Sequence, residues 1–257
     1  MKITVITVCH NSASTVADTL RSITVQSHPD IEHIVIDGGS SDDTLSIVRT
    51  LGSRVTTIVS EPDQGIYDAM NKGLQLATGD FVGFLNADDT LATPESLANI
   101  AKAAAQSVDV VYGDVVYVDP DETSKVIRYW NSGRFAARRL RYGWMPPHPT
   151  FYVRRALQNV LGLFDVQLRI AADYDFMLRI LSRSGIEVAY VPRVLVRMRV
   201  GGASNKSLRA VVNKSREDLL ALRKNKVGGW SALVCKNLRK LPQFALRPAT
   251  FYHMTST

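Results

Sequence analysis

The chain has 257 residues, of which 46% are hydrophobic and 21% charged, with 16 Gly and 10 Pro. This composition and length exclude collagen-like, low-complexity and largely disordered proteins, and fit one large domain or one domain with an extension. No run approaches roughly 18 consecutive apolar residues, so we expect no membrane-spanning helix. Residues 1–8 are too short and too rich in Thr for a signal peptide, and two cysteines cannot build a disulfide framework or a four-thiolate zinc site. The sequence therefore predicts a soluble cytosolic protein.

The charge is unevenly distributed along the chain. Residues 193–247 contain fourteen Lys or Arg but only two acids, Glu217 and Asp218, so this span carries a net charge of +12. The whole chain carries +7, so the remaining residues carry −5. A basic C-terminal extension on an acidic body predicts an anionic partner for that end of the chain.

Strands and helices alternate through the first half of the chain. The β-branched run at residues 3–8 is typical of a strand buried on both faces, and further strands are expected over residues 31–36, 54–59 and 81–85. Helices are expected over residues 13–23, 45–51 and 66–77, and from Pro94, which would occupy the first helical position. Ser12 or Ser14 is available to cap the first helix. These crossovers predict a mostly parallel sheet.

The second half of the chain is less regular. We expect a strand over residues 108–118, a loop-rich segment over 119–150, a short strand over 151–153, and helices over 173–181 and 208–222. Asp173 is expected to cap the first of these two helices.

Three polar, loop-forming clusters follow predicted strands, at residues 9–12, 37–40 and 86–89. Ligands of mostly parallel sheets bind beyond the carboxyl ends of the strands, so we expect these clusters to converge on one crevice. Asp88 and Asp89 either hold a divalent cation on a diphosphate or form a solvated turn before a helix. Asp37, followed by Gly38 and Gly39, either allows close approach of a nucleotide or forms a tight turn.

Two predicted helices carry further polar residues. Asp68, Asn71 and Lys72 are spaced by three and four residues, so we expect them to share one face, which is either a binding face or a solvated one. Asp173 is either a chemical group or only a helix cap.

The order and spacing of these motifs resemble the inverting family 2 glycosyltransferases with the GT-A fold, specifically the small bacterial enzymes of surface-polysaccharide and glycolipid assembly. The resemblance covers roughly residues 1–205. The motifs that carry it are Cys9-His10-Asn11, the runs 37–44 (DGGSSDDT) and 63–73 (DQGIYDAMNKG), Gly79-Asp80 with the run 84–89 (FLNADD), and the runs 148–151 (HPTF) and 172–175 (ADYD).

The resemblance implies a Rossmann-like, mostly parallel central sheet flanked by helices. It divides the chain into a nucleotide-sugar half (1–90), an acceptor half (91–205) and a basic amphipathic helical extension (206–257). It also implies that Asp37 contacts the base of a nucleotide sugar, that Asp88 holds Mg²⁺ or Mn²⁺ on the diphosphate, and that Asp173 is the catalytic base. The implied donor-binding residues are Thr7, Asn11, Asp37, Asp68, Asn71, Asn86 and Asp88.

Two positions depart from the family pattern. Asn86 stands where the first carboxylate of the metal motif is often Asp; it can still hydrogen-bond a ribose hydroxyl, but Asp88 is left as the principal metal ligand. Ala172 stands where the family usually has Glu, so Asp173 lacks a neighbouring carboxylate that would raise its pKa by like-charge repulsion.

The implied reaction is a single in-line displacement on the donor. Asp173 would take the proton of the acceptor hydroxyl, the metal would stabilise the leaving diphosphate, and an α-linked donor would give a β-linked product. The acceptor would be a saccharide or a polyprenyl-linked sugar. His148, in a Pro-rich loop, either contacts the acceptor or the donor phosphate or has no special role, whereas His10 is expected to be structural.

Other functions remain open from the residues alone. A nucleotide-dependent dehydrogenase would need a Gly-x-Gly-x-x-Gly turn after the first strand, but residues 9–14 contain no glycine. A sugar-nucleotide nucleotidyltransferase would need a Gly- and Lys/Arg-rich phosphate loop near the start, which is missing. A protein that binds nucleic acid, or a non-catalytic protein of anionic surfaces, would explain the basic extension but not the converging aspartates. We therefore expect no nucleic-acid partner.

Residues 226–247 contain five basic residues and no acid. Their apolar residues are Trp230, Leu233, Val234, Leu238 and Leu241, which recur at helical spacing, followed by Phe244 and Leu246. This pattern is typical of a helix that lies on an anionic membrane surface, with Trp at the headgroup level. Such contact would place the protein peripherally at the inner face of the cell membrane, beside a lipid-linked acceptor. The alternative is a helix whose apolar stripe packs on the rest of the protein.

Overall fold

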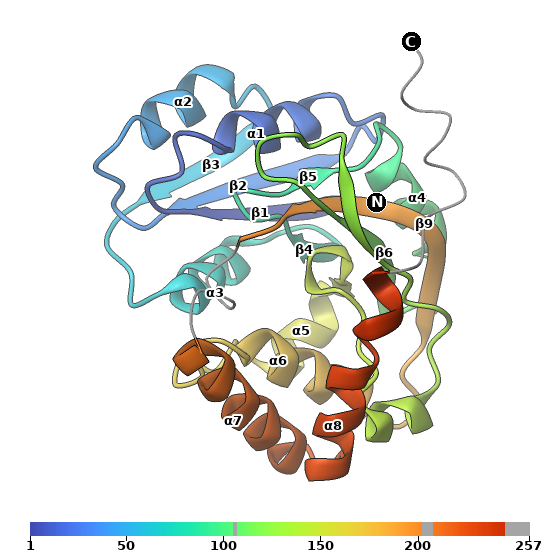
Figure 1. Ribbon diagram of the computed structural model, residues 1–257. Coiled ribbons are helices and arrows are strands. Elements are labelled where there is room, and N and C mark those ends of the chain that lie inside the picture. The colour runs from blue at the N-terminus through green and yellow to red at the C-terminus, as the bar shows by residue number, and fades with distance from the viewer. Residues whose placement is uncertain (105–106, 202–207, 245–257) are drawn as a thin grey trace.

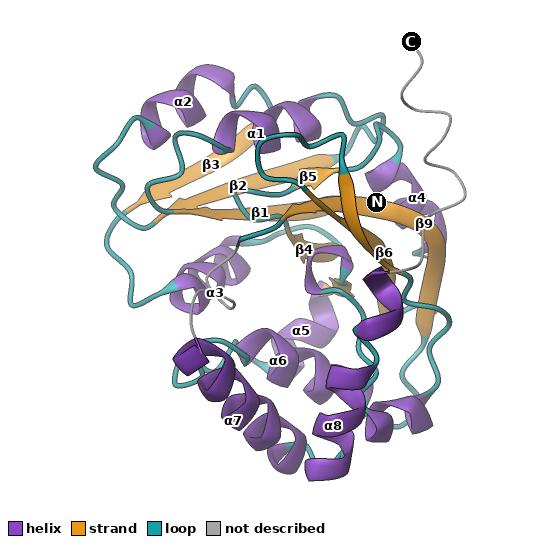
Figure 2. Cartoon of the chain, viewed as in Figure 1, coloured by secondary structure: helices purple, strands orange, loops and turns teal. Residues whose placement is uncertain are grey.

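The computed structural model describes residues 1–104, 107–201 and 208–244. One twisted sheet runs through the described residues, with helices on both of its faces (Figures 1 and 2). Its first four strands are all parallel and lie in the spatial order β3 (Val55–Ser60), β2 (Ile31–Asp37), β1 (Ile3–Cys9) and β4 (Phe81–Phe84). The sequence predicts all four to within one residue at each end.

The second half of the chain adds both parallel and antiparallel strands to the sheet. Its strands are β5 (Thr90–Leu91), β6 (Val110–Val118), β7 (Val126–Trp130), β8 (Tyr152–Arg154) and β9 (Val188–Arg199). β8 lies antiparallel between β4 and β6, β9 pairs in parallel with β6, and β5 and β7 pair antiparallel with β9 and β6. The sequence predicts neither β7 nor β9; every residue of β7 is half-buried, so no alternation of apolar and polar residues marks it.

Helices cover both faces of the sheet (Figure 1). α1 (Val16–Thr24), α2 (Thr44–Leu51) and α4 (Ser96–Ala103) lie on one face, and α3 (Ile66–Leu76), α5 (Arg155–Leu161) and α6 (Ala172–Leu181) lie on the other. β1 is apolar on both faces for this reason. Ile3 and Val5 enter the core beneath α4, whereas Ile6 and Val8 enter the core beneath α3.

Two helices begin later than predicted. α1 begins at Val16, and no side chain caps it, because the backbone carbonyl of Ser12 accepts the N–H groups of Thr15 and Val16. α4 begins at Ser96, so Pro94 lies in the turn that precedes the helix. The predicted cap of α1 and the predicted position of Pro94 are therefore wrong.

The C-terminal extension packs on the body of the protein. α7 (Leu208–Lys224) packs against α6, α8 (Trp230–Leu238) packs against α7 and the 3-10 helix η1 (Ala137–Tyr142), and the 3-10 helix η4 (Leu241–Phe244) packs against β7 (Figure 1). Leu222, Val227 and Leu233 join the buried cluster that includes α6. Leu233 is the one residue of the predicted apolar stripe that packs on the body; the others, Trp230, Val234, Leu238 and Leu241, are exposed. Lys236 is buried in an ion pair with Asp218 (2.7 Å) rather than available to an anionic surface.

Some predictions concern residues outside the described part of the chain. They include the boundary at residues 205 and 206, Leu246 and Arg247, and the side chain of Phe244. Within residues 1–104, 107–201 and 208–244, no helix is both long enough and apolar enough to cross a membrane.

Candidate active site

The loops that follow β1 and β2 meet at one edge of the sheet. Asn11, just beyond β1, has a φ of 49°, and its backbone N–H donates to Ser40 Oγ (2.8 Å). Its side-chain Oδ1 accepts the backbone N–H of Ser41 (2.9 Å). His10 belongs to the same junction, with Nδ1 3.1 Å from the carbonyl oxygen of Gly38. The first two polar clusters are therefore adjacent, as their positions after parallel strands predict.

Asp37, at the end of β2, is buried and surrounded by protein donors. Oδ1 accepts the hydroxyl of Ser40 (2.5 Å), and Oδ2 accepts the backbone N–H of Ser40 (3.1 Å) and the hydroxyl of Ser60 (2.7 Å). Burial alone would raise the pKa of Asp37, but these hydrogen bonds outweigh burial and lower the pKa. Asp37 is therefore an ionised group that fixes the loop of residues 37–40.

The absence of a side chain at Gly38 leaves room for the carboxylate of Asp63, where the sequence predicts room for a nucleotide. A Cβ atom at Gly38 would lie 2.3 Å from Asp63 Oδ2. Asp63 also accepts the backbone N–H of Gly65 through Oδ1 (2.8 Å). The segment that leads into α3 therefore closes against the loop after β2, and the predicted donor-binding set omits Asp63, a constituent of this junction.

The acidic turn, which we define as residues 86–89, follows β4. The carbonyl of Asn86 accepts the backbone N–H of Asp89 (3.0 Å). Burial raises the pKa of Asp88, while burial and then the charge of Asp88 raise the pKa of Asp89 well above its ordinary value. Asn86 Oδ1 and Asp89 Oδ2 are buried and have no hydrogen-bond partner within the described residues. These oxygens fit a hard divalent cation.

The acidic turn cannot enclose such a cation by itself. Across the described residues, no group of three His, Cys, Asp or Glu side chains is arranged to hold a metal ion. Mg²⁺ is usually held by one or two carboxylates together with substrate phosphates and water. The turn fits this kind of shared site, in which the Asn86 amide oxygen and an Asp carboxylate of the turn would be the protein's ligands.

Arg199, at the end of β9, holds the acidic turn in place. Its Nη1 donates to the carbonyl oxygen of Asp88 (3.0 Å), and its Nη2 pairs with Asp18 of α1 (2.5 Å). Its charge lowers the pKa of Asp88, although burial has the larger and opposite effect. The sequence places Arg199 only within a basic span, because nothing local indicates a contact with a residue 111 positions away.

Asp173 lies in the first turn of α6 and does not cap this helix, contrary to the prediction. The cap position is Ala171, and no side chain makes the cap hydrogen bond. Asp173 Oδ1 accepts the backbone N–H of Tyr174 (2.8 Å) and lies 3.2 Å from the hydroxyl of Tyr67 in α3. The described residues donate no hydrogen bond to its Oδ2. The protein therefore holds one oxygen of the carboxylate, and the other receives no hydrogen bond from the described residues.

Glu217 of α7 holds the segment that leads into α6. Its carboxylate accepts the backbone N–H groups of Arg169 (3.2 Å), Ile170 (2.8 Å) and Ala171 (2.9 Å). These N–H groups lie just before the helix, where backbone donors lack partners within it. Through Glu217 the C-terminal extension thereby fixes the entry to the helix that carries Asp173.

The charges of Asp89 in the acidic turn and of Asp173 both affect the pKa of Tyr117. Burial raises the pKa of Tyr117 in β6, Arg128 lowers it, and the charges of Asp89 and Asp173 both raise it. The charges of two acids from elements far apart in the sequence therefore act on one hydroxyl, and we treat the acidic turn and Asp173 as parts of one candidate site.

His148 lies in the wall of this site. Its ring is buried and stacks on Phe84 of β4, with centroids 5.3 Å apart, and its Nε2 has no hydrogen-bond partner within the described residues. Burial lowers the pKa of His148, although the charge of Asp173 raises it. The structure therefore contains a neutral imidazole near Asp173 with one unsatisfied nitrogen.

Comparison with known proteins identifies the family. The family described as Glycosyl transferase family 2 matches residues 4–161. A PGL/p-HBAD biosynthesis glycosyltransferase of Mycobacterium tuberculosis is 36% identical over 202 residues, which cover 76% of either chain. The chain belongs to glycosyltransferase family 2.

Solved structures resemble this glycosyltransferase in fold. S. aureus TarS 1-349 in complex with UDP-GlcNAc has a TM-score of 0.67 at 20% identity, covering 88% of this chain and 66% of that one. A mannosyltransferase from Pyrobaculum calidifontis in complex with GDP-Man and Mn2+ has a TM-score of 0.66 at 21% identity, covering 95% and 73%. The match spans only 39% of a longer TarS chain. The predicted GT-A fold is confirmed.

One residue of the predicted donor-binding set lies away from the glycosyltransferase's site. Thr7 of β1 is fully buried, and its hydroxyl lies 3.0 Å from Nε2 of His33 in β2. The side chain therefore lies between two strands rather than at the sheet edge, and we remove it from the candidate donor contacts. The sequence places Thr7 one residue before the strand's last apolar position but does not show which way its side chain points.

The polar residues of α3 do not share one face as predicted. Asp68 and Lys72 lie together on the outer side, with 3.9 Å between Asp68 Oδ2 and Lys72 Nζ. Asn71 is buried, and its amide bonds the backbone N–H and carbonyl of Phe164 (2.8 and 3.0 Å). Tyr67, four residues before Asn71, shares the buried side and is the α3 residue that contacts Asp173.

We expect Glu217→Ala to lower kcat of the glycosyltransferase by about tenfold or more with little change in donor KM, since a misplaced catalytic group can cost up to about 10²-fold. Glu217→Gln retains an acceptor oxygen and should restore part of kcat. Steady-state kinetics of both variants, alongside their thermal unfolding, provide the test. A variant that unfolds at lower temperature but keeps its full kcat would show that Glu217 only stabilises the fold.

Proposed function

We propose that this glycosyltransferase transfers a sugar from a nucleoside-diphosphate sugar to a hydroxyl of a saccharide or lipid-linked acceptor, with inversion, in the assembly of a cell-surface polysaccharide or glycolipid. The observation that carries the proposal is Oδ2 of Asp173, to which the described residues donate no hydrogen bond. The names of similar proteins support the donor and acceptor classes: TarS was solved with UDP-GlcNAc, the mannosyltransferase with GDP-Man and Mn2+, and the mycobacterial relative is named for PGL/p-HBAD biosynthesis.

The donor would lie along the edge of the sheet formed by β2, β1 and β4. Its nucleoside would contact the junction of Asn11, Asp37 and Asp63, where loops from three elements meet. Its diphosphate would reach the acidic turn, where Asp88 and Asn86 offer oxygens to a shared divalent cation. When bound, Mg²⁺ or Mn²⁺ supplies positive charge that stabilises the leaving diphosphate.

Asp173 would act as the general base. Tyr67 and the backbone N–H of Tyr174 hold Oδ1, which leaves Oδ2 to accept the proton of the acceptor hydroxyl as that oxygen attacks the anomeric carbon. The new glycosidic bond forms as the bond to the diphosphate breaks, so the configuration inverts in one displacement. His148, neutral and unsatisfied at Nε2, would orient the acceptor or the donor phosphate from the wall of the site.

Release of nucleoside diphosphate from a panel of sugar nucleotides tests this proposal. With Mg²⁺ or Mn²⁺ present, one donor should be consumed faster than the others, and acceptor extracts should increase the rate. No release from any UDP-, GDP-, ADP-, CDP- or dTDP-sugar, with or without acceptor, would contradict the proposed donor class.

We also propose that the outer face of the extension contacts an anionic membrane surface. Trp230, Val234 and Leu238 follow each other at intervals of four on α8, and together with Leu241 they are 55–66% exposed. Arg223 and Lys226 are exposed just before the helix. Apolar side chains flanked by basic ones suit the interface of an anionic bilayer, with about 1 kcal/mol from each basic residue near the surface.

The exposed face of α8 can be tested without removing the helix. Truncation after Arg223 would also remove the buried Val227 and Leu233, so the substitutions Trp230→Ser and Leu238→Ser are cleaner. We expect this double variant to bind anionic vesicles at least about tenfold more weakly in sedimentation, since each large apolar side chain contributes roughly 1.5–3 kcal/mol when fully buried. Val160→Ser, a control at a residue 72% exposed on α5, should sediment as the unaltered protein does.

Equal sedimentation of the double variant and the Val160→Ser control would contradict membrane contact through α8. Binding that depends on neither anionic lipid nor salt would contradict the electrostatic part of the proposal.

A further inference from the structure

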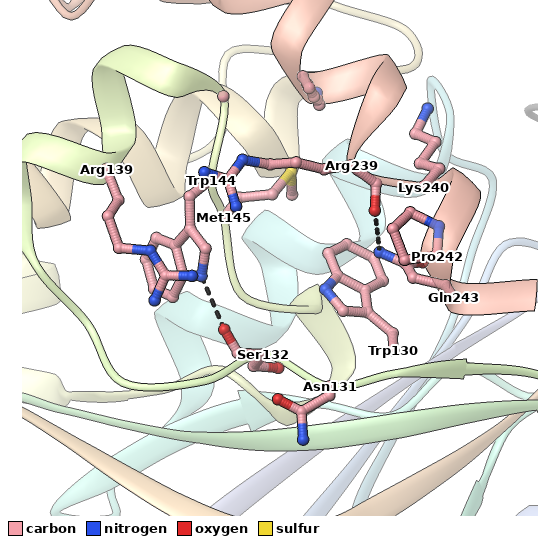
Figure 3. Close-up of a pocket in the computed structure, with 12 residues that line it drawn as sticks. Trp130, Asn131, Ser132, Arg139, Trp144, Met145, Arg239, Lys240, Pro242 and Gln243 are labelled. Carbon is pink, nitrogen blue, oxygen red and sulfur yellow. Dashed lines mark hydrogen bonds between the residues drawn. The ribbon is translucent and has the colours of Figure 1, made fainter. Parts of the chain in front are cut away.

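A cavity of about 170 Å³ lies between β7, the 3-10 helix η1 (Ala137–Tyr142) and the end of α8 (Figure 3). Gly143 allows η1 to pack closely there, because a Cβ atom at this residue would lie 2.5 Å from the carbonyl oxygen of Ala232 in α8. Trp130 and Trp144 supply aromatic surface to the lining. Four cationic side chains and no acidic one line this cavity, namely Arg139, Lys236, Arg239 and Lys240.

Three of these cations lack an acidic partner. Only Lys236 forms an ion pair, with Asp218; no acid within the described part of the chain pairs with the others. Arg139 donates to the carbonyl of Arg134 (2.6 Å), Arg239 to the carbonyl of Tyr142 (3.0 Å), and Lys240 to the amide of Asn237 (3.1 Å). Positive charge therefore gathers in a concave surface with only neutral acceptors.

Cations outnumber acids around Lys240. Burial lowers the pKa of Lys240, the charges of Lys214 and Arg128 lower it further, and the charge of Asp218 raises it. Arg239 extends from the end of α8 toward Trp144 (Figure 3). The guanidinium of Arg139 lies over the ring of Trp144, 5.6 Å from its centroid. An anion would offset this repulsion, and phosphate oxygens match the fork of donors that two arginines present.

One residue of the cavity lining contacts the neighbour of the proposed base in the sequence. Nζ of Lys236 lies 3.4 Å from the centroid of the Tyr174 ring, the residue next to Asp173, and the charge of Asp173 raises the pKa of Lys236 against the larger effect of burial. On the other side, Arg128 of β7 lies over the ring of Tyr117 (4.5 Å), the tyrosine that both acids influence. The cavity is thus built from the acceptor half and the extension, away from the loop after β2.

We propose that this cavity binds the phosphate or diphosphate group of the acceptor, with Arg139, Arg239 and Lys240 facing its oxygens and Trp130 against the adjoining sugar or apolar chain. The inference rests on the proposed function, since it assigns an acceptor class to the same site. A phosphate ester can come from a lipid-linked or a water-soluble phosphorylated acceptor, and both present the same anionic group to the cavity. In either case the anion would hold the acceptor so that its hydroxyl reaches Asp173.

Binding of inorganic pyrophosphate and of a short-chain prenyl diphosphate, measured by calorimetry, tests this assignment. Chelator is added so that no metal holds either probe at the acidic turn. The double variant Arg239→Gln with Lys240→Gln should bind both probes at least about tenfold more weakly, since it removes two charged hydrogen-bond donors from the cavity. The variant Arg239→Lys with Lys240→Arg keeps the charges and should bind nearly as the unaltered chain does. Lys102→Gln, at an exposed position on α4, should have no effect.

The two probes distinguish the sources of the phosphate. Tighter binding of the prenyl diphosphate, lost on Trp130→Ala, indicates a lipid-linked acceptor, whereas equal binding of both indicates a soluble one. Binding that is unchanged in the Arg239→Gln, Lys240→Gln variant, or absent in the unaltered protein, would overturn the assignment. Binding needs no turnover, so failure of the donor panel and failure of this cavity are separate results.

Discussion

Asp173→Asn is expected to lower kcat by about 10²-fold or more, the usual scale of a general-base contribution. The amide keeps the size of the side chain and an oxygen for the N–H of Tyr174, but it cannot accept the proton of the acceptor hydroxyl. Because Asp173 does not cap α6, the substitution should leave the helix and its stability nearly unchanged. Steady-state kinetics with the donor identified by nucleotide release, together with thermal unfolding, measure both effects.

The control for this substitution is Asp165→Asn. Asp165 lies shortly before α6 and pairs with Lys224 at the protein surface (2.8 Å), so the change removes a nearby charge without altering the proposed base. It should retain kcat, and calorimetry should show similar nucleoside-diphosphate affinity for both variants. Full turnover in Asp173→Asn would assign proton removal to another group.

Asp88→Ala is expected to reduce transfer by about 10²-fold or more, because loss of a metal's charge stabilisation costs several kcal/mol of barrier. The fold should persist, since Asp88 raises the pKa of the buried Asp89 and its removal relieves that repulsion. Titration with Mn²⁺ should show a higher metal requirement in the variant, measured as nucleotide release. Thermal unfolding should show no loss of stability.

The chelator experiment separates a metal ligand from other roles of Asp88. EDTA should abolish activity of the unaltered enzyme, and excess Mg²⁺ should restore it. Activity that persists in Asp88→Ala and also withstands chelator would show a metal-independent enzyme, and the acidic turn would then be only structural.

The parallel half of the fold could be predicted because its signals are local. β1, β2 and β4 are short apolar runs bounded by turn residues and bury most of their side chains, and β3 alternates half-buried and exposed residues. β7 and β9 could not be predicted in this way, because their residues are mostly half-buried and their position depends on pairing with β6. The side-chain cap predicted for α1 is wrong because the backbone carbonyl of Ser12, which no sequence pattern marks, accepts the first N–H groups instead.

The candidate site also contains residues that local sequence motifs indicate and residues that depend on contacts distant in the sequence. Asp37, Asp88 and Asp173 follow strands or open a helix within ordered motifs, so the sequence indicates them directly. Tyr67, Glu217 and Arg199 act through contacts between residues 106, 46 and 111 positions apart. No local pattern encodes such contacts; they follow from the packing of α3, α7 and β9 around the site.

The anomeric configuration of the product tests the central claim most directly. Nucleotide release identifies the donor, and sugar nucleotides such as UDP-GlcNAc and GDP-Man are α-linked. Proton NMR of the product, recorded early in the reaction, then reports the anomeric configuration of the new bond. One displacement with Asp173 as the base predicts a β-linked product, at a rate that falls with Asp173→Asn. An α-linked product would contradict the account, because retention requires a different course of reaction and leaves the free oxygen of Asp173 without its proposed role.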